Sequence, residues 1–418
     1  MNYQQDLICR IRKEFSVSEN EVRDRLKKYY PQLTGSMMRT WERTGELEMR
    51  VIDGQKQYFN RAVGNFFLLN KEAKILKDSV DGEKNGAVDI FKQRYLSLLF
   101  SKNEIISGLP FDCKKIRVEY SVRLKANVIP SGEIVRCWLP YPRIHLQRQT
   151  SVEFLNAGGD RYVIAPEKQL QRTIYIEKPA YKDSVTEFRA SYILHTASQW
   201  FNIDPANIKP YDTSSRLFQE YTAEQLPHIV FSDQIKQLSR KIVGNETNPF
   251  WQVRSLYYWI DSHIPWAGAL EYSVMECIPE YVLKHRHGDC GMQTFLFLSM
   301  ARSLGIPCKW QSGWYLLPEE KNLHDWAEVY YEGIGWVPVD VSFRLTDSAD
   351  RRVREFYLNG MDSYRLIIND GYAQKLFPAK KYPRSEPYDF QRGELEWNGG
   401  NLYFDKWSYH MKVSVEPM

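Results

Sequence analysis

The sequence predicts an α+β protein in which a helical region, an antiparallel β-sandwich and a mixed core follow one another along the chain. Residues 1–110 carry mainly helical patterns. Between residues 111 and 200, apolar residues recur at every second position, which is typical of strands with one buried face. Between residues 286 and 340, a cysteine opens an apolar helical stretch, and a histidine and an aspartate follow on two strand-like stretches. A chain of 418 residues is long for one hydrophobic core, so we expect two or three domains.

The N-terminal region, residues 1–110, is expected to be mainly helical. Residues 19–29 and 37–42 have helical patterns, and Ile52-Asp53-Gly54-Gln55 is a turn signal between two strand-like runs. Two short helices before a hairpin indicate a small winged-helix-like unit. Acidic neighbours largely offset its basic residues, so we interpret its surface as solvated and mixed in charge, and we expect no nucleic-acid partner.

A β-sandwich domain is expected over residues 111–200. Ile116 to Leu124 alternates apolar and charged residues, and several shorter strand-like runs follow. Turn residues such as Pro130-Ser131-Gly132 separate these runs, which favours an antiparallel sandwich. Residues 201–375 would then form the core with its connecting segment, and residues 376–418 a C-terminal tail that adds edge strands.

The core contains a cysteine in the first turn of an expected helix. Asp289 stands where a side-chain oxygen would cap free N–H groups, and Gly305-Ile306-Pro307 supplies a glycine stop followed by a proline. Cys290 would therefore feel the positive end of the helix dipole, which favours the thiolate and makes a better nucleophile. We expect the glycines at 288 and 291 to leave room for a substrate backbone.

A histidine and an aspartate are expected on the two strands of a hairpin that follows this helix. The stretches that contain His324 and Asp340 are rich in aromatic and β-branched residues, with glycines between them. Because side chains alternate along a strand, the two share a face only if paired residue numbers sum to an even value. A loop of about three residues would pair Tyr331 with Gly335 and set Asp340 diagonal to His324. The aspartate would then hold the imidazole in the tautomer that faces the sulfur.

Four blocks of this region resemble the transglutaminase-like superfamily, whose members have a papain-like thiol core. In the family's order, they are Gly288-Asp289-Cys290, Arg302-Ser303-Leu304-Gly305-Ile306-Pro307, His324-Asp325-Trp326-Ala327-Glu328-Val329 and Gly335-Trp336-Val337-Pro338-Val339-Asp340. The resemblance covers about residues 240–375. It implies a bacterial-type member with a papain/transglutaminase-like catalytic core, in which Cys290 is the nucleophile, His324 the general acid/base and Asp340 its orienting partner.

Three further residues are expected to bind substrate. The resemblance implies an aromatic residue upstream of the cysteine, and we assign Trp266 to that position. Trp266 would line the site or donate a hydrogen bond to an oxyanion, with a packing role as the alternative. Gly291 and Trp326, close in sequence to the cysteine and the histidine, complete the set.

A metal site is the main competing chemistry in this region. His285, His287, Asp289 and Cys290 lie within six residues, and zinc accepts all of these ligand types. The two histidines precede the helix in a loop, however, and no fourth ligand stands at a family-like spacing. We therefore expect no metal and no other cofactor. The remaining cysteines show no paired metal-ligand spacing and are interpreted as small buried hydrophobes.

These residues predict a thiol-dependent enzyme that cleaves or transfers an amide through an acyl-enzyme on Cys290. We favour a cysteine hydrolase of the peptidase or amidase kind, because the sequence has no convincing calcium loop of the sort that animal cross-linking enzymes use. Two alternatives are a protein-glutamine transglutaminase with an amine acceptor and a non-catalytic binding or scaffold module on the same fold. The expected substrate is a peptide, a protein or a cell-wall peptide.

Charge and hydropathy bear on partners and location. The net charge of +4 is too small to indicate nucleic acid or an anionic membrane as the main partner. No stretch approaches the roughly 20 apolar residues of a membrane span, and the first residues lack the apolar core of a signal peptide. As written, the chain is expected in the cytoplasm, or in the cell envelope if an upstream export signal is missing. The sequence does not predict an oligomeric state.

Overall fold

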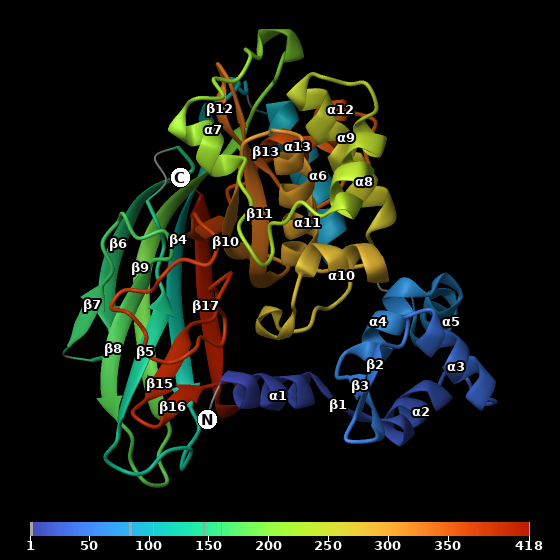
Figure 1. The fold of residues 1–418 in the computed structure, drawn as a ribbon. Helices are drawn as coiled ribbons and strands as arrows, with labels where there is room; N and C mark the ends of the chain where they lie inside the picture. The colour runs from blue at the N-terminus through green and yellow to red at the C-terminus, as the bar shows by residue number, and fades with distance from the viewer. Residues whose placement is uncertain (1–2, 83–85, 103, 145–146, 160, 418) are drawn as a thin grey trace.

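A computed structural model describes residues 3–82, 86–102, 104–144, 147–159 and 161–417. Within these ranges the chain combines helices with four antiparallel β-sheets (Figure 1). The predicted α+β class is therefore confirmed.

The N-terminal unit is a bundle of short helices with a three-stranded sheet in the order β1-β3-β2. Its elements are α1 (Tyr3–Glu14), β1 (Phe15–Ser18), α2 (Glu19–Lys27), α3 (Gly35–Arg43), β2 (Met49–Ile52), β3 (Gln55–Phe59), α4 (Ala62–Leu69) and α5 (Lys71–Asp81). Ser18 and Glu21 form a capping box at the start of α2. The unit contains the two short helices followed by a hairpin that the sequence predicts, as α2, α3, β2 and β3. The next helix, α6 (Ala87–Lys102), packs instead against α12 (Arg351–Arg354) of the core.

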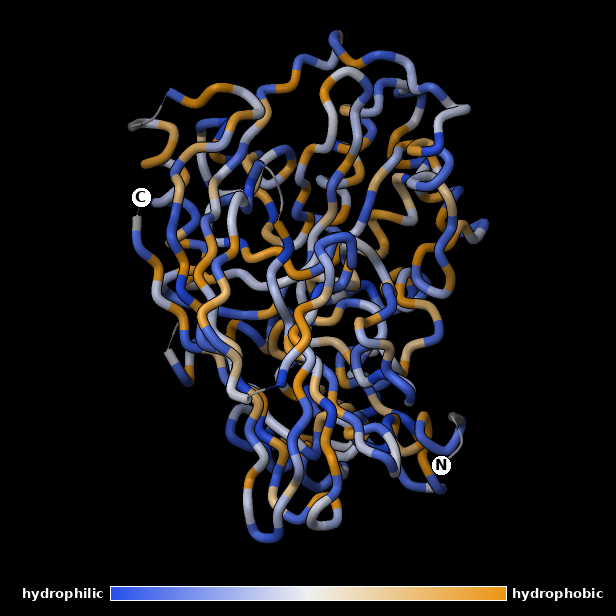
Figure 2. Tube along the Cα trace, turned by 90° about the vertical axis from the view of Figure 1, so that its left-hand side faces the viewer, coloured by the Kyte–Doolittle hydropathy of each residue, from blue (hydrophilic) through white to orange (hydrophobic). Residues whose placement is uncertain are grey.

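The sandwich consists of two sheets whose inner faces share one apolar core. Its strands are β4 (Pro110–Leu124), β5 (Ile134–Pro140), β6 (Gln149–Ala157), β7 (Tyr162–Ile164), β8 (Thr173–Pro179), β9 (Thr186–Trp200), β13 (Gly360–Met361), β15 (Glu394–Trp397), β16 (Gly400–Leu402) and β17 (Trp407–Pro417). One sheet has the order β13-β9-β4-β17, with β6 also paired to β9, and the other has the order β16-β15-β5-β8-β7. Figure 2 shows hydrophilic and hydrophobic residues alternating along these strands, as the period of two requires.

The C-terminal tail belongs structurally to the sandwich. Strand β17 pairs with β4 from Trp407 opposite Leu124 to Pro417 opposite Lys114. Strand β15 pairs with β5, so the tail contributes to both sheets. The segment between β14 (Arg365–Asn369) and β15 crosses from the core to the sandwich and lines the candidate site.

The core surrounds a central helix, α11 (Cys290–Ser303), with a four-stranded sheet and further helices. The sheet has the order β12-β11-β10-β14. The elements of the core are α7 (Arg216–Tyr221), α8 (Asp233–Val243), α9 (Pro249–His263), α10 (Ile278–His285), β10 (Cys308–Leu316), β11 (Lys321–Tyr331), β12 (Gly335–Val339), α13 (Phe356–Asn359) and β14 (Arg365–Asn369), with short 3₁₀ turns at Pro205–Asn207 and Tyr272–Val274. A third 3₁₀ turn, Phe404–Lys406, joins β16 to β17 in the sandwich. Helix α11 is apolar on every side because α8, α9, α10 and the sheet all cover it.

In the part of the chain that the structure describes, no helix has the length and apolar character needed to cross a lipid bilayer.

Candidate active site

Cys290 is the first residue of α11, as predicted. Asp289 caps the helix by accepting a hydrogen bond from the Met292 backbone N–H at 3.1 Å, and it also accepts one from the Tyr272 hydroxyl at 2.5 Å. Gly305, with φ of +78°, follows the last turn of the helix. Local sequence signals therefore fix where the helix starts and where the thiol lies.

The hairpin of β11 and β12 has the register that the parity argument predicts. Tyr331 pairs with Gly335 and Ala327 with Val339. Asp340 is therefore diagonal to His324, and His324 Nε2 lies 2.7 Å from Asp340 Oδ2. Because Nε2 faces the carboxylate, a neutral His324 keeps its proton there and leaves Nδ1 as the proton-accepting atom.

Asp340 is a strongly held carboxylate. Its Oδ1 accepts hydrogen bonds at 3.1 Å from the backbone N–H groups of Ser342 and Phe343, and Arg365 Nη1 lies 2.8 Å from its Oδ2. Although burial opposes ionisation, His324, Arg365 and the Phe343 N–H hold the pKa of Asp340 below its usual range. Burial lowers the pKa of His324, and the charge of Asp340 partly offsets that effect. The resting pair is therefore an ionised aspartate beside a neutral imidazole.

The thiol of Cys290 contacts Asp325, the chain neighbour of His324. Its Sγ donates to Asp325 Oδ2 at 3.4 Å. Among the described residues, no hydrogen bond joins Cys290 directly to His324. The structure therefore brings His324 and Asp340 together and places Cys290 beside Asp325, the residue after His324. Gln391 fixes this arrangement, since its Nε2 donates to Asp325 Oδ1 at 2.8 Å and to the His324 carbonyl at 2.7 Å.

The expectation that the helix dipole makes Cys290 a thiolate is wrong for this resting structure. Burial, and then the carboxylates of Asp325 and Asp289, raise the pKa of the thiol well above its usual value. Burial and the neighbouring Asp389 and Asp289 likewise raise the pKa of Asp325. The resting thiol is therefore protonated.

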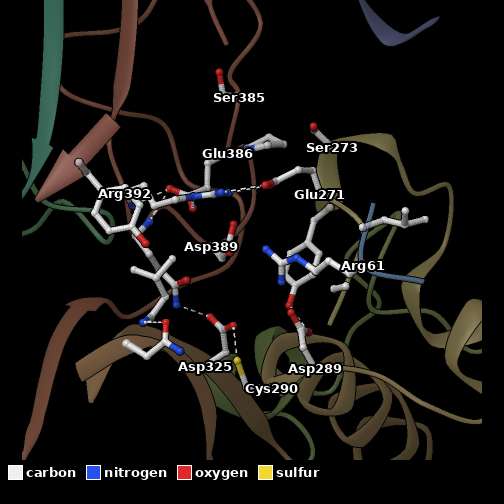
Figure 3. A pocket seen from close by; sticks show the side chains of 18 of the residues that line it. Arg61, Glu271, Ser273, Asp289, Cys290, Asp325, Ser385, Glu386, Asp389 and Arg392 are labelled. Carbon is white, nitrogen blue, oxygen red and sulfur yellow. Dashed lines mark hydrogen bonds and ion pairs between the residues drawn. The ribbon is translucent and has the colours of Figure 1, made fainter. Parts of the chain in front are cut away.

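A cavity of about 220 Å³ opens over Cys290 (Figure 3). Three parts of the chain form it: Arg61 from the N-terminal unit, the core with Cys290 and Asp325, and the tail segment that includes Asp389 and Arg392. His324 and Asp340 are not among the described residues that line the cavity; they are buried, with exposed fractions of 3% and 0%. The thiol is thus the group of the predicted triad that a ligand in the cavity meets first.

Trp266 is the one of the three expected substrate-binding residues that lines this cavity. Its side chain is 45% exposed, and its backbone forms a parallel bridge with Gly288, two residues before the cysteine. Trp326 is fully buried and donates from Nε1 to Gln311 Oε1 at 2.7 Å, so it packs in the core.

Gly291 is needed for a reason other than the one the sequence suggested. A Cβ atom at this position would overlap the Tyr272 hydroxyl and lie 2.7 Å from Asp325 Oδ2. The space beside the helix start is therefore filled by two side chains of the protein rather than kept for a substrate backbone.

Metal ligation finds no support in the described residues, where no group of three or more His, Cys, Asp or Glu side chains is placed to hold a metal ion. His287 is buried, and burial lowers its pKa to about 4. His285 stacks on Tyr281, with ring centroids 4.1 Å apart.

Sequence reasoning missed the other polar residues of the site. Asp325 lies inside a recognised block, and its position next to His324 could have singled it out. Tyr272, Asp389 and Gln391 lie outside the four blocks, and nothing in their local sequence indicates that folding brings them to Cys290.

Comparison with known proteins agrees with this geometry. Residues 236–341 match the model of the transglutaminase-like superfamily. The chain contains a transglutaminase-like domain. This domain includes α9, α10, α11, the strand β11 that carries His324, and β12, which ends one residue before Asp340.

Two relatives extend the comparison beyond the transglutaminase-like domain. An uncharacterised protein of Haemophilus influenzae is 24% identical in an alignment of 249 residues that covers 51% of this chain and 65% of the relative. The chain thus spans slightly less than two thirds of that relative's length. A crystal structure of a candidate cysteine protease from Cytophaga hutchinsonii is 14% identical, has a TM-score of 0.50 and covers 74% of this chain and 92% of its own. At this identity the likeness shows a shared fold.

Proposed function

We propose that the protein is a thiol-dependent acyl-transfer enzyme that cleaves amides of peptide or protein substrates through a Cys290 acyl-enzyme. The observation that carries the proposal is the buried His324–Asp340 pair, with 2.7 Å between Nε2 and Oδ2, one residue along β11 from the group that contacts the Cys290 thiol. A cysteine at a capped helix start, an imidazole and an ionised carboxylate are the parts that amide acyl transfer requires.

In the proposed reaction, substrate entry displaces the thiol from Asp325 and the Cys290 proton passes to His324 Nδ1. Asp340 stabilises the imidazolium that results. The thiolate attacks the amide carbonyl, a carbon–sulfur bond forms, and backbone N–H groups at the start of α11 stabilise the oxyanion. The carbon–nitrogen bond then breaks as His324 returns the proton to the departing amine. Water completes hydrolysis by attacking the thioester, while His324 takes a proton from the water and returns it to the sulfur.

The acceptor in the last step distinguishes hydrolysis from transamidation. We propose hydrolysis, and a protein-glutamine transglutaminase would use an amine in place of water. A scaffold protein would form no thioester at all.

The test is intact mass spectrometry of the wild-type protein with a peptide library, with and without added amines, beside Cys290→Ala as the control. Cleaved peptides and a transient adduct on Cys290, both absent in Cys290→Ala, would support the peptidase. Amine-coupled products would support transglutaminase activity instead. Equal binding of peptides by both proteins without any product would favour the scaffold.

A further inference from the structure

The cavity over Cys290 has an excess of acidic side chains. Two guanidinium groups, of Arg61 and Arg392, also line it. The five carboxylates that line it belong to Glu271, Asp289, Asp325, Glu386 and Asp389 (Figure 3). A carboxylate of this cavity that lacks a partner within the protein is the one most able to bind a ligand.

Arg392 forms ion pairs with two of the carboxylates. Its guanidinium lies 2.6 Å from Glu271 and 2.8 Å from Glu386. Glu386 also accepts hydrogen bonds from the backbone N–H groups of Gln391, at 2.6 Å, and Arg392, at 2.8 Å. Glu271 and Glu386 are therefore part of the cavity wall.

Two more carboxylates have structural partners. Asp289 caps α11 and accepts from Tyr272, while Asp325 accepts from Gln391 and the Cys290 thiol. Both bonds to Asp289 reach its Oδ1, and each of these two carboxylates is held in place by hydrogen bonds from other residues.

Asp389 differs from the other four. Its exposed fraction is 7%, and within the described residues no neighbouring residue donates a hydrogen bond to its carboxylate, whose recorded donor is its own backbone N–H. Burial and the nearby charge of Glu386 raise its pKa, and Asp389 in turn raises that of Asp325. Arg392 offsets only part of this effect, and a bound cation with N–H groups would further favour the ionised carboxylate.

We propose that the cavity binds a primary ammonium group of the substrate on Asp389, close to the amide that reacts at Cys290. The location of the amide rests on the proposed function, whereas the ammonium site rests on the cavity itself. The described carboxylates do not converge as metal ligands do. The small cavity beside a single free carboxylate suits a compact ammonium with three donors better than the wide planar fork of a guanidinium.

The charge preference of the cavity can be measured without any enzymatic turnover. Methanethiosulfonates react with a cysteine thiolate to form a mixed disulfide and release methanesulfinate. The 2-aminoethyl reagent is cationic and the 2-sulfonatoethyl reagent is anionic. Their rate ratio at Cys290, measured by peptide mapping and divided by the ratio at the exposed Cys113, reports the field in the cavity.

We expect this normalised ratio to be about tenfold or more, the enrichment that a charged cleft gives a counter-ion. Asp389→Asn should bring it close to one. Glu153→Gln, which removes an exposed carboxylate on β6, should leave it unchanged. A wild-type ratio near one, or a ratio that Asp389→Asn does not change, would overturn the proposal.

Calorimetry replaces the labelling if Cys290 reacts with neither reagent. A free dipeptide amide and its N-acetyl form are titrated into Cys290→Ala and into Cys290→Ala with Asp389→Asn. Tighter binding of the free amine, lost in the double variant, supports the site, and equal binding of both peptides refutes it. Because both tests work without catalysis, the ammonium site can stand if the proposed function fails.

Two kinds of substrate amine fit this chemistry, and the arms of a turnover experiment distinguish them. A preference for donor peptides with a free N-terminus over N-acetylated ones would assign the site to the acyl donor. If N-acetylation of the donor does not change its rate of reaction, but an added amine reacts faster than its hydroxyl analogue, the site belongs to the acyl acceptor. Asp389→Asn should abolish whichever preference is found.

Discussion

Cys290 lies at the start of α11, where the helix dipole favours a thiolate, but carboxylates that oppose ionisation surround it. Such a dipole contributes at most about 2 kcal/mol, whereas full burial can shift a pKa by about 3 to 5 units, each worth about 1.4 kcal/mol. Burial and the charges of Asp325 and Asp289 therefore dominate and keep the resting thiol protonated. Under the proposed function, ionisation of the thiol then depends on a base, which is the role proposed for His324.

Gly291→Ala tests how tightly the site is packed. The new methyl group would overlap the Tyr272 hydroxyl and press on Asp325, so we expect a loss of about 1–3 kcal/mol in unfolding free energy and altered reactivity of Cys290. Gly64→Ala in α4 is the matched control, because no atom lies within 4 Å of its added Cβ. In urea unfolding the control should be neutral or more stable by up to about 1 kcal/mol. A Gly291→Ala protein as stable as wild type would contradict this account.

The hairpin of β11 and β12 shows how much a local sequence pattern can predict. Alternation and a three-residue loop are enough to place Asp340 diagonal to His324, and the capping signals are enough to place Cys290 at the helix start. Contacts between distant segments have no such local signal. Gln391 reaches His324 and Asp325 only because the tail crosses to the sandwich, and Asp389 enters the cavity for the same reason.

Asp340→Asn tests the ionised pair at the base of the hairpin. The pKa of Asp340 is lower in the folded protein than its unfolded value of about 3.9, so its stabilising contribution is present above about pH 4 and is lost as pH falls further. The variant also leaves the buried Arg365 with one carboxylate partner fewer, and we expect a loss of about 3–5 kcal/mol at pH 7.

The pH dependence of urea midpoints distinguishes this charge effect from a loss of packing. The difference between wild type and Asp340→Asn should be constant from pH 7 to about 5 and should shrink below pH 4. A difference that persists unchanged at pH 3 would show that Asp340 stabilises the protein through packing and hydrogen bonds rather than through its charge.

The whole molecule builds its cavity where three parts of the chain meet. The N-terminal unit attaches to the loop that carries Trp266: Asn65 donates to the Gly268 carbonyl and accepts from the Gly268 N–H, both at 2.8 Å. Arg10 reaches the tail by donating to the Arg384 carbonyl at 2.8 Å. The N-terminal unit is thus a structural wall of the site, which the sequence of residues 1–110 alone did not indicate.

Asn65→Ala tests this attachment. The substitution leaves a buried N–H and a buried carbonyl of Gly268 without their partner, so we expect a loss of about 1–3 kcal/mol in stability and greater hydrogen exchange in the Trp266 loop. Asn207→Ala removes an exposed asparagine and should change stability by less than about 0.5 kcal/mol. Unchanged exchange around Trp266 in Asn65→Ala would show that the loop holds its position without the N-terminal unit.

The central claim is that His324 activates Cys290, and the pH profile of Cys290 alkylation tests it most directly. Labelling by iodoacetamide is followed by peptide mapping in wild type and in the His324→Gln, Asp340→Asn and Asp325→Asn variants, with Cys113 as the internal reference. We expect His324→Gln and Asp340→Asn to slow labelling at pH 7 by about tenfold or more. Asp325→Asn should accelerate it, because removal of that carboxylate lowers the pKa of the thiol. If His324→Gln labels as fast as wild type across the profile, His324 is not the base for Cys290 and the proposed mechanism is wrong.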